Sequence, residues 1–315
     1  MIDITTLGEL LIDLTQGGTD ENGNGKFTAY PGGAPANVAV AAARLGASTA
    51  FIGKVGNDAF GRSLAETLRK DKVNTDGLYY DDTHPTTMAI VSVDASGERE
   101  FAFYRDPGAD TQLTVEEAVA ALSKDMPKIL HVGSLSMTTS PGKEACVEAV
   151  KHAKANGTMI SYDPNYRAAL WDSEDHAVEM MKALLPYADV LKVADEEMQM
   201  LTWVDDLEEG SRILAEYGPG LVLVTLGGDG VFVRMGNRTA KIPGYKVDVA
   251  DTNGAGDTFL GAMLMQIASG KVVKEDAWEQ LLHMVRYANK AASLTCSRHG
   301  AIPAMPTLEE MEREF

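Results

Sequence analysis

Residues 251–257, with the sequence Asp-Thr-Asn-Gly-Ala-Gly-Asp, carry the groups best suited to chemistry. Apolar residues recur at helical spacing directly after them, at Phe259, Met263 and Ile267, so we expect a buried helix that begins near Gly254. The first N–H groups of such a helix have no partner within it, and the helix dipole adds partial positive charge there. Small residues at Gly254, Ala255 and Gly256 let another molecule approach those N–H groups. The segment is therefore typical of an anion-binding site.

Asp257 follows in the first turn of this expected helix, where the charge of a transferring phosphoryl group would accumulate. A carboxylate at this point could act as the general base that takes a proton from an acceptor hydroxyl. The alternative is an aspartate that only complements the positive end of the helix dipole. The sequence Gly-Ala-Gly-Asp alone does not distinguish these two interpretations.

Two further glycine-rich segments could bind ligands. In residues 32–37, Gly32 and Gly33 permit close backbone approach, and Asn37 offers both donors and acceptors to a small polar ligand, or else only caps a helix. In residues 222–233, a strand is followed by Leu-Gly-Gly-Asp-Gly and a second strand. This second segment is either a tight turn or a contact with a nucleotide.

The elements that must position these groups alternate between short β-like runs and helical runs. We expect strands at residues 2–7, 49–52, 129–132, 159–162, 190–192 and 221–225, and helices at residues 37–45, 61–70, 143–155 and 175–184. This alternation predicts an α/β fold with a doubly wound, mostly parallel sheet flanked by helices. We expect a single domain over residues 1–315.

Two regions break that rhythm. Residues 10–30 hold a polar, Gly-rich turn at 16–26 between two strand-like runs, and residues 86–105 read as a hairpin with its turn at 95–97. They either decorate the edge of the main sheet or form a small β-sheet lid over a ligand cleft. A lid with exposed strand edges would favour a homodimer formed through it.

Composition excludes several classes of function. A net charge of -18, from 46 acidic and 28 basic residues, argues against nucleic-acid binding and against docking on anionic membranes. Cys146 and Cys296 suggest neither a disulfide framework nor a metal cluster. The first fourteen residues contain Asp3, Glu9 and Asp13 and no basic segment, so we expect no secretory signal and a cytoplasmic location.

Taken together, the motifs resemble the ribokinase family of sugar kinases over essentially the whole chain. One family signature runs from Gly32 and Gly33 through Asn37 to Gly46 and Gly56, and the other is the 251–257 segment. Residues 162–167 (Tyr-Asp-Pro-Asn-Tyr-Arg) and 98–105 are specifically similar to fructokinases. No Gly-x-x-x-x-Gly-Lys-Ser/Thr run is present, so the site is not a P-loop.

The resemblance implies a role for each matching residue. Asp257 would be the base, and the N–H groups of Gly254, Ala255 and Gly256 would hold the transferring phosphoryl. The residues that would contact the sugar are Asp13, Gly32, Gly33, Asn37, Phe103, Arg105 and Arg167. Those that would border ATP are Thr225, Gly227, Gly230 and Asn289.

The residues expected at the metal site depart from the family pattern at one position. Many relatives carry an Asn-x-x-Glu element for the magnesium shell, and here Ala194 occupies the Asn position while Glu197 keeps the carboxylate. We expect Mg²⁺ held mainly by phosphates and water, with Glu197 as the protein carboxylate. Asp251 matches a carboxylate beside a monovalent-cation site, which makes K⁺ activation compatible with the sequence.

Three functions compete. We expect phosphorylation of D-fructose to fructose 6-phosphate from ATP. The alternatives are a sibling kinase acting on 2-keto-3-deoxygluconate or a ribosyl compound, and a non-enzymatic sugar-binding paralogue. Asp257 argues against a mere binder, which needs no base at an anion site. A sugar acid would need a cation, which Arg105 or Arg167 could supply.

Overall fold

The computed structural model describes residues 1–93, 99–271 and 274–313, and within them the strands form two separate sheets. The strands of the larger sheet are β1 (Ile4–Leu7), β4 (Thr49–Gly56), β5 (Asn74–Asp81), β8 (Ile129–Gly133), β9 (Met159–Asp163), β10 (Val190–Ala194), β11 (Leu221–Thr225), β12 (Val231–Met235) and β13 (Arg238–Ile242). Their spatial order is β13-β12-β11-β10-β9-β8-β1-β4-β5. All neighbouring pairs are parallel except β11–β12 and β12–β13.

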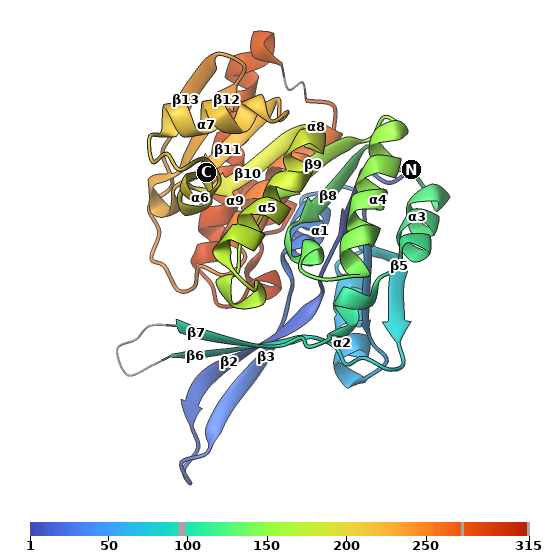
Figure 1. Cartoon of the computed structure of the whole chain (residues 1–315). Helices are drawn as coiled ribbons and strands as arrows, with labels where there is room; N and C mark the ends of the chain where they lie inside the picture. The colour runs from blue at the N-terminus through green and yellow to red at the C-terminus, as the bar shows by residue number, and fades with distance from the viewer. Residues whose placement is uncertain (94–98, 272–273, 314–315) are drawn as a thin grey trace.

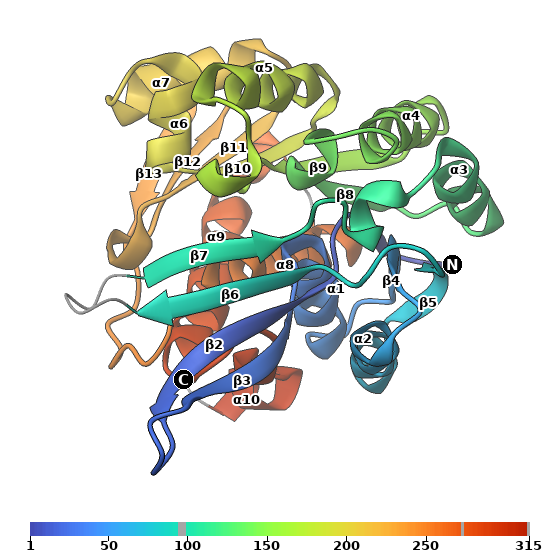
Figure 2. The same ribbon diagram turned by 60° about the horizontal axis from the view of Figure 1, so that its bottom comes forward.

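Helices cover both faces of this sheet, as Figure 2 shows from the side of the lid. One layer contains α3 (Val115–Lys124), α4 (Gly142–Ala155), α5 (Glu174–Leu184), α6 (Asp195–Thr202) and α7 (Leu207–Glu216). The other contains α1 (Ala34–Arg44), α2 (Ala59–Lys70), α8 (Ala255–Ala268), α9 (Trp278–Cys296) and α10 (Leu308–Arg313). The buried strands face apolar clusters on both sides, as a parallel sheet requires. The fold is therefore the doubly wound α/β architecture that the sequence predicts.

The second sheet is a lid that projects from the lower end of the body in Figure 1. It consists of β2 (Leu11–Thr19), β3 (Gly25–Gly32), β6 (Met88–Val93) and β7 (Arg99–Tyr104) in the order β3-β2-β6-β7. Because these strands pair with one another and not with the main sheet, they do not decorate its edge. The predicted turn at 95–97 lies outside the described residues.

Several predicted boundaries need correction. The turn between β2 and β3 is shorter than residues 16–26, since pairing continues to Thr19 and resumes at Gly25. The first helix begins at Ala34 and not at Asn37, because Gly33 caps it with φ 108° and a proline at the helix start is compatible with helical φ. Strand β11 (Leu221–Thr225) has the predicted bounds.

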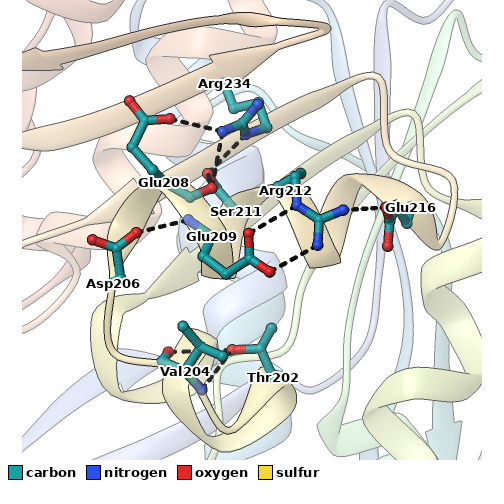
Figure 3. A network of polar contacts seen from close by, with 9 residues as sticks. All are labelled: Thr202, Val204, Asp206, Glu208, Glu209, Ser211, Arg212, Glu216 and Arg234. Atoms are coloured by element: carbon teal, nitrogen blue, oxygen red, sulfur yellow. Dashed lines mark hydrogen bonds and ion pairs between the residues drawn. The ribbon is translucent and has the colours of Figure 1, made fainter.

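The antiparallel edge strands are anchored to α7 by a polar network, shown in Figure 3. Asp206 caps α7 by accepting a hydrogen bond from the N–H of Glu209 at 2.9 Å. Arg234 of β12 donates to Ser211 Oγ and to the Glu208 carboxylate, both at 2.8 Å. These bonds hold β12 against the body, and β12 begins directly after the glycine turn at residues 227–230. Within the described residues, no helix is long and apolar enough to cross a membrane.

Candidate active site

Two cavities meet at the start of α8, at the carboxyl edge of the parallel strands. The smaller, of about 290 Å³, is lined by Asn37, Gly254 and Asp257 among others. The larger, of about 810 Å³, is lined by Ala255, Gly256 and residues that follow β10 and β11. One helical turn thus separates a cavity sized for a compact ligand from a cavity sized for a larger one. In open α/β sheets, ligands bind at the carboxyl edge of the strands.

The backbone at the start of α8 is shaped by its neighbours. Gly254 is the N-cap residue with φ 75°, a left-handed conformation that favours glycine. A Cβ on Gly254 would also lie 2.8 Å from the Cβ of Ala301. Gly254 therefore places no side chain in front of the first turn of α8, where the Ala255 N–H donates to the Thr252 carbonyl at 3.3 Å.

Asp257 is buried in the first turn of α8 and is held by a residue of α1. Asn37 Nδ2 donates to Asp257 Oδ2 at 2.8 Å, and both residues are less than a tenth exposed. Burial raises the pKa of Asp257 to about 6; the Asn37 hydrogen bond opposes that rise, as do the charges of Lys192 and Arg167, while Asp163 adds to it. The carboxylate is thus poised to accept a proton close to neutral pH.

The lid supplies a second carboxylate to the smaller cavity. Asp13 of β2 lines it together with Gly33, and burial raises the pKa of Asp13 to about 6. Gly32 is opposite Leu11 in the β2–β3 pairing and does not line the cavity, but a Cβ there would lie 2.2 Å from Asp13 Oδ2. Gly32 therefore leaves room for the Asp13 side chain.

The two predicted sugar-binding arginines differ in their placement. Arg167 lines the smaller cavity, as Phe103 does, and its charge lowers the pKa of both Asp13 and Asp257. Arg105 is not among the lining residues. Its guanidinium donates to Asp110 Oδ2, Thr138 Oγ1 and the Leu135 carbonyl at 2.7–2.9 Å. These bonds tie the end of β7 to the body, so the predicted sugar contact of Arg105 has no support in this geometry.

The predicted nucleotide residues lie together in the larger cavity, which is lined by Thr225, Gly227, Gly230 and Asn289. Gly227 has open space around its Cβ position, whereas a Cβ on Gly230 would lie 2.0 Å from the Ile242 carbonyl oxygen. Asn289 Nδ2 donates to the Pro243 carbonyl at 3.1 Å. Gly230 and Asn289 thus also shape the cavity wall.

The two predicted metal carboxylates have backbone partners. Glu197 accepts from Tyr166 N at 2.6 Å and from Ala194 N at 2.7 Å. Asp251 accepts from Asn253 N and Gly300 N, each at 3.0 Å. The described residues contain no group of three or more His, Cys, Asp or Glu side chains that could hold a metal ion. An ionised carboxylate keeps acceptor capacity beyond one bond per oxygen, so these backbone bonds leave both residues able to accept from the water shell of a metal ion. The metal roles of both residues stay predictions.

Sequence reasoning assigned no role to three other residues of the site, although Asn165 and Asn253 lie within the motifs at 162–167 and 251–257. Glu9, which follows β1, lines the smaller cavity along with Asn165 and Asn253. Glu9 Oε1 accepts from Ala34 N at 2.9 Å, and burial raises the pKa of Glu9 to about 7. The available signal was positional, since Glu9 and Asn165 directly follow strands at the carboxyl edge.

Comparisons with known proteins identify the family of the chain. The model of the pfkB family of carbohydrate kinases matches residues 1–308. Fructokinase-1 of Zea mays is 39% identical over 312 residues, which cover 98% of this chain and 96% of that protein. A fructokinase with bound ATP from Xylella fastidiosa superposes with a TM-score of 0.89 at 34% identity, covering 98% of this chain and 97% of that one. A fructokinase from Vibrio cholerae O395, in its fructose-, ADP- and calcium-bound form, superposes with a TM-score of 0.87 at 33% identity, covering 99% and 98%.

Proposed function

The chain belongs to the pfkB family of carbohydrate kinases, and we propose that it transfers the γ-phosphoryl group of ATP to D-fructose to form fructose 6-phosphate. It is a sugar kinase, and relatives and structural neighbours that align over nearly the whole chain are named fructokinases. One observation carries the proposal: Asp257 lies where a small cavity and a nucleotide-sized cavity meet.

Each residue of the meeting point has a chemical task in this reaction. Asp257 accepts the proton of the sugar hydroxyl as that oxygen attacks the γ-phosphorus. The N–H groups at the start of α8 stabilise the negative charge that spreads over the phosphoryl oxygens. Asn37 holds Asp257 through one carboxylate oxygen, which leaves the other oxygen for the hydroxyl. Asp13, Gly33 and Phe103 enclose the sugar from the lid side.

A bound magnesium ion would supply positive charge that neutralises the phosphates of ATP. Glu197 is the protein carboxylate that we assign to its water shell, although it is the neighbours of Glu197, Asp195 and Glu196, that line the nucleotide cavity. We assign Asp251 to a monovalent cation beside the anion site. A double mutant of the Vibrio cholerae O395 fructokinase has a crystal structure in a fructose-, ADP- and potassium-bound form.

The charge of the smaller cavity favours a neutral sugar over a sugar acid. Among its described lining residues, the acidic side chains are Glu9, Asp13 and Asp257, and Arg167 is the one cation. A carboxylate substrate would face all three acids. The specific argument for the runner-up, 2-keto-3-deoxygluconate, is Arg167 itself, because an exposed guanidinium at the rim could bind a carboxylate in bidentate fashion.

A substrate panel tests the proposal. We expect kcat/KM with ATP to be highest for D-fructose among fructose, ribose and 2-keto-3-deoxygluconate, by up to about 10⁴-fold where built hydrogen bonds lose their partners. Arg167→Gln should then lower kcat/KM for fructose only modestly. A higher kcat/KM for the sugar acid, abolished by Arg167→Gln, would transfer the function to the runner-up.

The oligomeric state and the location of the protein are also proposals. A homodimer formed through the lid rests on the exposed face of β2, β3, β6 and β7, which carries Phe27 and Tyr104 at 49% and 60% exposure. A cytoplasmic location rests on composition alone. Sedimentation of the purified protein tests the dimer, and fractionation of the source cells tests the location.

A further inference from the structure

A buried ion pair lies behind the anion site, and neither of its residues takes part in the proton transfer assigned to Asp257. Lys192 of β10 donates to Asp163 Oδ2 of β9 at 2.9 Å. The Lys192 side chain is 9% exposed and the Asp163 side chain 2%. Within the described residues, Asp163 Oδ1 is buried and has no hydrogen-bond partner. Such a pair costs desolvation free energy, and packed apolar residues often serve stability as well or better.

The location of the ammonium group is also unusual. Lys192 Nζ lies 3.2 Å from the position that a Cβ on Gly256 would occupy, which places it against the first turn of α8. The positive end of a helix dipole attracts anions and disfavours cations. In the empty site the charges of Asp163, Glu197 and Asp257 offset this effect, since together they raise the pKa of Lys192 despite its burial. A bound anion at the turn would be a further partner for both positive groups.

The geometry identifies that anion. Gly256 lines the nucleotide cavity and Asp257 lines the sugar cavity, so Lys192 stands behind the point where the phosphoryl group crosses. Lys192 itself lines neither cavity, so it acts through the intervening turn and not by direct contact. The charge of Lys192 also lowers the pKa of Asp257, and the charge of Asp163 raises it.

We propose that Lys192 is an electrostatic positioning residue of phosphoryl transfer: Asp163 holds it against the α8 turn, where it adds positive charge to the anion site. Asp163 balances Lys192 while the site is empty. When the γ-phosphoryl group occupies the α8 N-terminus, its negative charge provides the counter-charge that the turn and the ammonium share. The inference deepens the proposed kinase reaction and rests on it, but not on which sugar is the acceptor.

The decisive variant is Lys192→Met combined with Asp163→Asn. Lys192→Met alone leaves a buried, unpaired carboxylate, which can unfold the protein for reasons unrelated to catalysis. The double variant removes both charges and keeps the approximate shapes. Lys54→Met is the matched control, because Lys54 is another buried strand lysine paired with a carboxylate, Glu117, at 2.7 Å, and it lies outside both cavities.

We expect the double variant to melt near the parent while its kcat falls at least about 30-fold, which is less than the roughly 10²–10³-fold that loss of a directly contacting donor costs. Its Kd for ATP, measured calorimetrically without sugar, should rise about tenfold more than its Kd for ADP, because only ATP carries the γ-phosphoryl group. Lys54→Met should leave kcat and both Kd values within about twofold of the parent, by the usual scale of changes away from a site.

A double variant with kcat within threefold of the parent, or with equal changes in the Kd of ATP and ADP, overturns the proposal and makes the pair a structural tie between β9 and β10. The acceptor for kcat is whichever sugar the parent turns over fastest. If the parent fails to phosphorylate fructose, that result counts against the proposed substrate alone, since the comparison of ATP with ADP needs no sugar.

Discussion

Asp257 is subject to opposing effects that together set its reactivity. Burial raises its pKa to about 6, and Asn37, Lys192 and Arg167 limit that rise. We expect Asp257→Asn to bind ATP and sugar but to lose about 10²–10⁴-fold in kcat, since the amide cannot accept the hydroxyl proton. Calorimetry and steady-state rates check the two halves of this expectation. A kcat within a few-fold of the parent would remove Asp257 from the mechanism.

The same pKa predicts the pH dependence of the reaction. The base must be ionised, and a pKa of about 6 means that the carboxylate form declines as the pH falls through that value. We therefore expect kcat/KM for the acceptor to be flat near neutral pH and to fall on the acidic side of about pH 6. Asp13 has a similarly raised pKa, so Asp13→Asn is the control. Glu9 lines the same cavity and has a pKa of about 7, so Glu9→Gln is a second control. Persistence of the acidic limb in both variants assigns it to Asp257, and its disappearance in one of them assigns it to the residue replaced there.

At the scale of elements, the contact between α1 and α8 sets the distance between Asn37 and Asp257. Ala41 and Gly261 lie one helical turn beyond these two residues, and a Cβ on Gly261 would lie 2.7 Å from the Cβ of Ala41 and 2.9 Å from the Val38 carbonyl oxygen. Gly261 therefore lets α1 and α8 approach closely enough for the 2.8 Å hydrogen bond between Asn37 and Asp257.

We expect Gly261→Ala to lower the free energy of unfolding by about 1–3 kcal/mol, because overpacking a tight contact outweighs the better helix propensity of alanine. It should also lower kcat, because the helices must separate. Gly210→Ala in α7 is the matched control, since the atoms nearest to its Cβ position belong to the flexible Met198 side chain. Denaturant titration and steady-state kinetics of both variants test this. Equal behaviour of the two would mean that the α1–α8 spacing does not govern the site.

The sequence predicts well the features that a local pattern determines, and poorly those that depend on contacts between distant segments. Elements with a local period, such as β11 and α5, are found within a residue of their predicted bounds, and the glycine-rich segments at 32–37 and 251–257 meet as expected. Glu9 and Lys192 belong to no local motif, because strand pairing alone brings them to the site. Arg105 illustrates the opposite limit, since the type and position of an arginine do not reveal that its donors are already bound by Asp110, Thr138 and Leu135.

At the scale of the whole molecule, the empty site carries an electrostatic strain. Glu9, Asp13 and Asp257 line one cavity, and burial raises the pKa of each. In the unfolded chain these groups regain ordinary pKa values, so at these three sites the folded protein binds more protons than the unfolded protein in the interval between. His131 partly offsets this, because burial lowers its pKa to about 3. The formal net charge of -18 adds a general repulsion of the same sign.

This strain predicts that the ligand-free protein becomes more stable as the pH is lowered from about 8 to about 6. The sign follows from Glu9: its folded pKa of about 7 exceeds its ordinary value of 4.5, so its contribution is fully present below the ordinary value and is lost as the pH rises through about 7. Glu9→Gln isolates this effect, because the amide oxygen can still accept the Ala34 N–H and nothing titrates. As the pH rises, we expect the Tm of the parent to fall more steeply than the Tm of Glu9→Gln. Toward the acidic end, the difference between the two Tm values should become constant. Parallel curves across the interval would show that Glu9 is already ionised in the folded protein.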